Sequence, residues 1–280
     1  MRVPWFSSAL VAMPPSATST ILALEFVLLL AGLVLLWRLG LSSAARVQTK
    51  LLPPWDVSLS DFFLFVWLVM LGGFAGGYLT GLYLKYHPHD TPHQLILGTA
   101  GMHGGMLLGM AFYRFAFARG QVRLTLALPG ALISGLATFL ISLPVLTAVS
   151  LLWQAVLRLC HYTVKPQDSI ELLRHTDSIP LKITLVAVAI LVAPVSEELI
   201  FRAGIFRYVR TRLPRWIALL LPAVLFALLH LDVGSFVPLI ALAVIFSLAY
   251  ERTGNIGTTM VAHALFNLNA ALLVLAGMDN

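Results

Sequence analysis

The last third of the chain places ionisable side chains inside strongly apolar sequence. Glu197, Glu198 and Arg202 follow closely on the run LKITLVAVAILVAPV at 181–195. Such a run is typical of a membrane-buried helix. A charge at the bilayer centre costs several kcal/mol, so ionisable residues there usually serve a function. We therefore take these three residues as candidates for chemistry inside a membrane.

Helical spacing separates the roles of these three charges. Glu198 and Arg202 stand four residues apart with the acid first, which favours an ion pair on one helix face. Glu197 is rotated by about 100° from Glu198, so it lacks this partner and can face a cavity. Pro194, one turn earlier, deprives an upstream carbonyl of its helical donor. We expect a local kink or widening there that could admit water.

Two further pairs at helical spacing follow in the same third of the chain. His263 and Asn267 share one helix face, and Phe226 and His230 share another. A carboxylate can act as a base on water, and an imidazole can relay the proton. A second imidazole and an amide can donate hydrogen bonds to an oxyanion. These groups suffice for attack of water on an amide without a covalent intermediate.

The sequence shows no convincing pattern for a serine or cysteine nucleophile. Ser196 sits beside Glu197, Cys160 is remote in sequence, and no GxSxG motif is present. As the single cysteine, Cys160 also excludes an intrachain disulfide.

The composition indicates an integral membrane protein. Of the 280 residues, 59% are hydrophobic and 11% are charged, and the mean hydropathy is +0.91. Soluble domains usually carry about 25% charged residues. In a membrane protein a net charge of +6 mainly sets topology, so we expect no nucleic-acid partner.

The hydropathy pattern predicts an all-α fold, a polytopic membrane helical bundle with about eight transmembrane helices. The sixth and seventh spans are short for a full crossing. The first span is expected to be retained rather than cleaved as a signal peptide. The distribution of basic residues favours both termini outside. The predicted spans are 20–39, 61–84, 95–117, 127–153, 181–201, 216–231, 235–251 and 257–276.

Three motifs occur in order: EELIFR at 197–202, FALLH at 226–230 and HALFN at 263–267. They read as EExxxR, FxxxH and HxxxN. Over about 180–276 the chain resembles the CPBP family of intramembrane glutamic proteases. That family contains type II CAAX prenyl endopeptidases and bacterial relatives linked to bacteriocin processing and self-immunity. We accordingly divide the chain into N-terminal transmembrane helices of unassigned role, 1–180, and a CPBP-like catalytic membrane domain, 181–276.

The resemblance implies roles for the motif residues. Glu197 would be the general base that activates water, with His230 as its partner. His263 and Asn267 would stabilise the oxyanion. The supporting residues would be Glu198, Arg202 and Phe226.

The resemblance also implies an intramembrane endopeptidase that uses no metal or other cofactor. Its partners would be membrane lipid and a peptide or protein substrate with a membrane-associated cleavage site. We expect a multi-pass protein of a bacterial cytoplasmic membrane.

Contact between Glu197 and His230 sets a condition on the fold. If the fifth and sixth spans crossed in opposite directions and ended as predicted, the two residues would lie at opposite faces, since about 14 residues of helix span roughly 21 Å. We therefore expect 196–212 to continue as a helix or to dip within the membrane. The interface would then be marked by Arg207, Arg210 and Arg212.

Three other functions remain open from the residues. A zinc-dependent membrane protease could use two histidines and a glutamate, although HExxH is absent. A non-enzymatic immunity or scaffold protein could keep the same fold. A transporter would relay protons through its carboxylates, but no internal repeat is visible.

Two clusters outside the motifs have simpler interpretations. The stretch HPHDTPH at 87–93 could bind a metal through His87, His89 and His93, but its prolines fit an exposed turn. Glycines recur every fourth residue in the third span and predict a close helix-packing face. His103 lies beside them and could bond a neighbouring helix or reach the active site. The glycines are Gly101, Gly105 and Gly109.

Overall fold

The computed structural model describes residues 15–47, 50–87, 90–118, 124–164 and 167–278. Within these residues the ordered elements are all helical. The α-helices are α1 Pro15–Leu35, α2 Ser43–Arg46, α3 Leu59–Tyr86, α4 Thr91–Ala116, α5 Leu128–Leu159, α6 Asp168–His175, α7 Ile179–Ala187, α8 Ala193–Glu198, α9 Arg207–Arg212, α10 Arg215–Leu229, α11 Phe236–Thr253 and α12 Ile256–Leu275. The wider π-helical segments are η1 Leu36–Leu41, η2 Val188–Val192 and η3 Leu199–Phe206.

The helix lengths confirm the predicted polytopic bundle. In the described part of the chain, seven helical runs are long and apolar enough to cross a membrane. One of them is Ile179–Arg212, in which α7 to α9 follow one another without a break, as expected for 196–212. The predicted sixth span corresponds to α10, whose 15 residues fall short of the roughly 20 that a full crossing needs. Among the described residues seven helical runs thus qualify by length, which is close to the predicted count of about eight.

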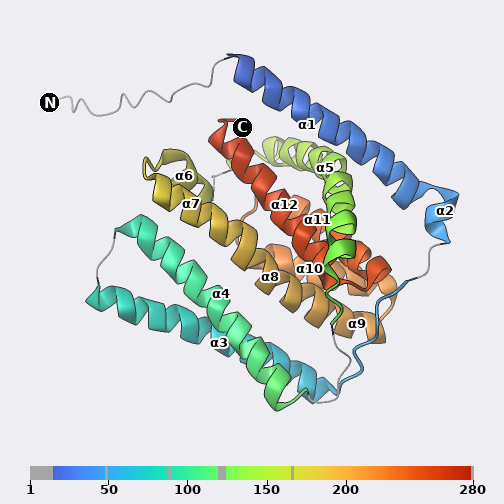
Figure 1. The fold of residues 1–280 in the computed structure, drawn as a ribbon, viewed down its shortest axis with the longest axis vertical. Helices are drawn as coiled ribbons and strands as arrows, with labels where there is room; N and C mark the ends of the chain where they lie inside the picture. The colour runs from blue at the N-terminus through green and yellow to red at the C-terminus, as the bar shows by residue number, and fades with distance from the viewer. Residues whose placement is uncertain (1–14, 48–49, 88–89, 119–123, 165–166, 279–280) are drawn as a thin grey trace.

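Helices α3 and α4 form a hairpin at one side of the molecule (Figure 1). Their backbones touch through glycines, because a Cβ at Gly105 would lie 2.0 Å from the Gly72 carbonyl oxygen. A Cβ at Gly76 would lie 2.1 Å from the carbonyl oxygen of Gly101. The predicted packing face is thus confirmed. It fixes α4 in register against α3.

Helix α5 supplies part of the buried core between the C-terminal helices α11 and α12. Helix α5 packs against α11 and α12, and α1 lies along its outer side (Figure 1). The side chains of Phe139, Leu143 and Leu146 meet Leu242 and Phe246 of α11 in one buried cluster. A helix from the N-terminal part of the chain therefore supports the region in which the three motifs lie.

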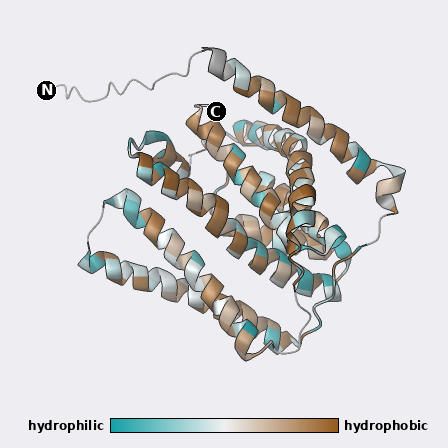
Figure 2. Cartoon of the chain, in the orientation of Figure 1, coloured by the Kyte–Doolittle hydropathy of each residue, from teal (hydrophilic) through white to brown (hydrophobic). Residues whose placement is uncertain are grey.

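The outer surface of the bundle is apolar. Hydrophobic residues run along most of the helices, as the brown ribbon in Figure 2 shows. Large side chains such as Phe115, Ile133 and Leu152 are exposed on it. A soluble monomer rarely exposes apolar patches of this extent. Lipid chains are the surroundings that this surface fits.

Arginines near the end of the run Ile179–Arg212 fasten other segments to it. Arg207 is buried and donates from Nε to the carbonyl oxygen of Pro53 (2.9 Å). Arg210, together with Arg215 at the start of α10, donates to the buried carboxylate of Glu251, at 2.7 and 2.8 Å. These contacts join the run to the segment before α3 and to the end of α11. The expectation that Arg207, Arg210 and Arg212 mark the membrane interface stays a prediction.

Candidate active site

The helix that carries the glutamates widens one turn before them. In η2 the N–H of Ala193 donates to the carbonyl of Val188, five residues back. The next carbonyl in this ladder is that of Ala189, and its partner would be Pro194, which has no N–H. Asn267 supplies the missing donor, because its Nδ2 lies 2.7 Å from the Ala189 oxygen. The expected widening at Pro194 is confirmed, and π-helical turns of this kind often occur at functional sites.

Glu198 and Arg202 form the ion pair that their spacing predicts. Arg202 Nη1 donates to Glu198 Oε1 at 3.0 Å, and the two side chains are 1% and 0% exposed. The guanidinium also lies 4.7 Å from the ring centre of Phe226 and 5.5 Å from that of Phe246. Buried charges need such partners, since an unpaired one costs several kcal/mol. The pair therefore neutralises two charges behind the site.

His263 lies between the two adjacent glutamates. Its Nδ1 is 2.9 Å from Glu198 Oε1, and its Nε2 is 3.7 Å from Glu197 Oε2. An ionised Glu198 can only accept, so Nδ1 carries the proton of this hydrogen bond. The longer distance to Glu197 is an electrostatic approach rather than a hydrogen bond. Glu197 thus keeps its carboxylate for other partners, and its side chain is 18% exposed.

His230 lies at the C-terminal end of α10. Its Nδ1 is 2.7 Å from the carbonyl oxygen of Phe226, one turn earlier. A carbonyl only accepts, so Nδ1 holds the hydrogen and Nε2 of a neutral imidazole is left as an acceptor. The ring of Phe226 packs against the imidazole at 4.6 Å between centres. The motif spacing FxxxH therefore fixes the orientation of His230.

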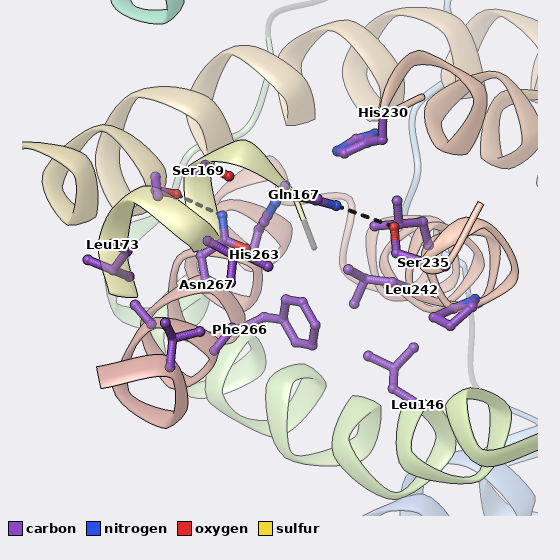
Figure 3. A pocket seen from close by; sticks show the side chains of 18 of the residues that line it. Leu146, Gln167, Ser169, Leu173, His230, Ser235, Leu242, His263, Phe266 and Asn267 are labelled. Atoms are coloured by element: carbon purple, nitrogen blue, oxygen red, sulfur yellow. Dashed lines mark hydrogen bonds between the residues drawn. The ribbon is translucent and has the colours of Figure 1, made fainter. Parts of the chain in front are cut away.

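The motif residues meet at a cavity of about 530 Å³, a volume within the usual range of ligand sites, roughly 300–1,000 Å³. Side chains from α5, α6, α11 and α12 line it, with His230, His263 and Asn267 directed toward it (Figure 3). The sequence-predicted residues on its wall are Glu197, Phe226, His230, His263 and Asn267.

The rest of the cavity wall is mostly apolar. Leu146 comes from α5, Leu242 from α11 and Phe266 from α12 (Figure 3). The short helix α6 adds Ile170 and Leu173. The four polar motif residues thus stand at one part of a chamber that is suited to an apolar chain.

The segment beside α6 is tied to the connection between α10 and α11. Gln167 Nε2 donates to Asp232 Oδ2 at 2.9 Å and also reaches Ser235 (dashed line in Figure 3). Ser235 Oγ and the N–H of Gly234 donate to the same carboxylate. Burial raises the pKa of Asp232, but these hydrogen bonds outweigh burial and hold the pKa below its usual value.

Comparison with known families supports the assignment of this region. Residues 179–269 match the family model described as "Type II CAAX prenyl endopeptidase Rce1-like". We use the name Rce1-like domain for these matched residues, 179–269. The predicted resemblance over about 180–276 is thereby confirmed. No curated protein and no solved structure gave a match to this chain.

The Rce1-like domain contains every motif residue but not the whole site. Its match ends before the last turns of α12 and excludes α3, α4, α5 and α6. Yet α5 and α6 line the cavity, and α4 packs against the helix that carries the glutamates. A division of function at residue 180 stays a prediction.

The structure brings most of the predicted site together and leaves one predicted contact unmade. Glu197 and His230 line the same cavity, but among the described residues no hydrogen bond or ion pair joins them directly. The contact between His263 and Glu198 was not foreseen from the sequence, because no spacing rule relates residues 65 positions apart. The role of Asn267 as a donor to the Ala189 carbonyl was also missed, although Pro194 signalled an orphan carbonyl.

His87 and His93 do not line this cavity. His87 Nδ1 is 3.2 Å from the Tyr83 carbonyl oxygen, and His93 contacts the carboxylate of Asp90, while His89 lies outside the described residues. In the described parts of the chain, no group of three or more His, Cys, Asp or Glu side chains is arranged to hold a metal ion.

Proposed function

We propose that this protein is an intramembrane endopeptidase in which Glu197 activates water to hydrolyse a peptide bond. One observation carries the proposal. Glu197, His230, His263 and Asn267 come from three separate helices and meet at one cavity in an otherwise apolar bundle. Placing four polar groups there is costly unless they act together. The match to the Rce1-like family supports the same class of reaction.

Water is the proposed nucleophile. Glu197 is the group at the cavity that is free to take a proton, because Glu198 is occupied by Arg202 and His263. Nε2 of His230 accepts the second hydrogen of the same water, since Nδ1 already donates to a carbonyl. Two acceptors that hold one water orient its lone pair toward the substrate carbonyl.

Attack forms a bond between the water oxygen and the carbonyl carbon, and Glu197 takes the released proton. The carbonyl oxygen becomes an oxyanion. Protonated His263 donates to it from Nε2, and Asn267 donates through its second N–H, the first being held by Ala189. The C–N bond then breaks as Glu197 returns the proton to the leaving nitrogen. The products are a carboxylic acid and an amine, and no covalent enzyme intermediate forms.

Glu198 and Arg202 do not line the cavity, and they act through the residues that do. Glu198 accepts from Nδ1 of His263, which holds the imidazole ring with Nε2 on the side of Glu197. Arg202 balances Glu198, so the carboxylate adds little net charge to the buried region. The ring of Phe226 packs against both the guanidinium of Arg202 and the imidazole of His230. The apolar wall favours a substrate whose cleavage site is membrane-associated.

The test compares membrane proteomes of cells that express wild-type protein or Glu197→Gln at equal levels, with all new N- and C-termini identified. Termini present only with the wild type support the proposal and name the substrate. Glu25→Gln, in the first span, is a matched change of charge outside the cavity wall and should retain those termini. Identical termini in wild type and Glu197→Gln, with membrane insertion equal, would instead favour an immunity or scaffold protein.

A further inference from the structure

A buried histidine outside the Rce1-like domain contacts the residue next to Glu197. His103 lies in the middle of α4 and is 6% exposed. Its Nδ1 is 2.7 Å from the hydroxyl oxygen of Ser196, which is fully buried. The two residues are 93 positions apart in the sequence. A bond of this length between two buried groups is a strong one.

The direction of this hydrogen bond follows from the neighbours of Ser196. The serine oxygen is also 3.0 Å from the carbonyl oxygen of Ala193 and 3.2 Å from that of Val192. Carbonyls only accept, so they take the one hydroxyl hydrogen, and His103 Nδ1–H donates to the serine oxygen. This arrangement gives both His103 Nδ1 and the serine hydroxyl a partner. It ties His103 to the turn in which the helix narrows from η2 into α8.

Helix α4 is well suited to hold that turn in place. It packs against η2, α7 and α8, and its other side is locked onto α3 by glycine contacts such as Gly105 against Gly72. The imidazole of His103 is also near enough to interact electrostatically with Glu197 and His230. His103 does not itself line the cavity.

We propose that His103 is a positioning residue for the general base: by holding Ser196 it fixes the turn that aims Glu197 into the cavity. This inference rests on the proposed function of Glu197. It also gives α4, outside the family match, a part in the reaction. Because His103 touches neither cavity nor substrate, its loss should lower kcat and leave KM unchanged. A misplacement of about 1 Å can cost on the order of a hundredfold in rate.

Two substitutions separate positioning from packing. In His103→Asn the side-chain N–H can take the place of Nδ1–H, so we expect kcat within about threefold of wild type. In His103→Leu the apolar side chain fills the space but cannot donate, and kcat should fall by about tenfold or more. A residue that only fills space would give the opposite order. His87→Leu, at the exposed end of α3, is the matched control.

A double-mutant cycle tests whether the effect passes through Ser196. Ser196→Ala removes the acceptor, so adding His103→Leu to it should lower kcat no further. The assay uses purified full-length protein in lipid vesicles and a quenched fluorogenic peptide that spans a cleavage site found in the proteome comparison. Additive losses in the cycle, or losses in KM rather than kcat, would overturn the proposal.

A second measurement needs no substrate and separates this inference from the proposed function. In protein labelled with ¹⁵N-histidine, the His103 ring signals should change in Ser196→Ala and in Glu197→Gln, but not in Glu25→Gln. If Glu197→Gln cleaves normally while these signals change as expected, the proposed function fails and the contact stands. If Glu197→Gln is inactive but His103→Leu has the wild-type kcat, only the positioning role fails.

Discussion

The burial of the Glu198–Arg202 ion pair predicts how much stability is lost when one of its two charges is removed. Both side chains are almost completely buried, and they share a hydrogen bond of 3.0 Å. Arg202→Met keeps much of the apolar stem but leaves Glu198 without its counter-charge. Breaking a buried pair in this way costs about 3–5 kcal/mol. Loss of the guanidinium from the face of Phe226, worth about 1–2 kcal/mol, is contained in that figure.

Removing both charges should cost less than removing one. In Glu198→Gln/Arg202→Met no buried charge is left alone, and the amide oxygen of glutamine can still accept from Nδ1 of His263. We expect the double variant to lose less than about 2 kcal/mol, since replacing both partners avoids the penalty of an unpaired charge. The coupling energy between the two positions should therefore be at least about 2 kcal/mol.

The assay is equilibrium unfolding of purified protein in lipid–detergent micelles, titrated with a denaturing detergent and followed by circular dichroism. Arg158→Met changes an exposed arginine on α5 and should alter the free energy of unfolding by less than about 0.5 kcal/mol. A double variant that loses the sum of the two single losses would refute the reasoning. So would an Arg202→Met protein that is as stable as wild type.

Other parts of the fold give further predictions. Gly105→Ala should destabilise the α3–α4 hairpin by about 1–3 kcal/mol through overpacking, whereas Gly104→Ala, whose Cβ meets nothing within 4 Å, should be neutral or slightly stabilising in the same unfolding assay. Asn267→Leu should cost about 1–3 kcal/mol because the partly buried Ala189 carbonyl loses its donor. A second change, Pro194→Ala, should recover most of this loss by supplying an N–H, and no recovery would contradict the proposed ladder. The pKa of Asp232 is lowered in the folded protein, so its ionised form stabilises the fold at pH values above the pKa of the unfolded carboxyl, about 3.9. The difference in free energy of unfolding between wild type and Asp232→Ala should therefore be largest at pH 7. It should shrink as the pH falls below about 4. If this difference in free energy of unfolding grew on acidification instead, the prediction would be wrong.

Local spacing predicted those parts of the site that lie within one helix. The pair of Glu198 and Arg202 is an example, because four residues bring side chains together wherever the helix packs. Pro194 likewise predicted a free carbonyl and a widened turn. The hydropathy pattern predicted the helices themselves, and it showed α10 to be short.

Contacts between helices could not be predicted in this way. Nothing in the sequence near His263 shows that it lies between two glutamates, because that position depends on how α12 packs against α8. The partner of the free carbonyl, Asn267, depends on the same packing. His103 was noticed for its unusual place among glycines, but its partner Ser196 follows only from the fit of α4 against α8.

The rate of cleavage by purified protein tests the central claim most directly. Wild type and Glu197→Gln are reconstituted in lipid vesicles and incubated with the same fluorogenic peptide, with and without a metal chelator. We predict that the wild-type rate is unchanged by the chelator and that Glu197→Gln is slower by at least about a hundredfold, the loss expected for a general base. Equal rates for wild type and Glu197→Gln, or a wild-type rate that vanishes with the chelator and returns with zinc, would contradict a glutamate-activated water.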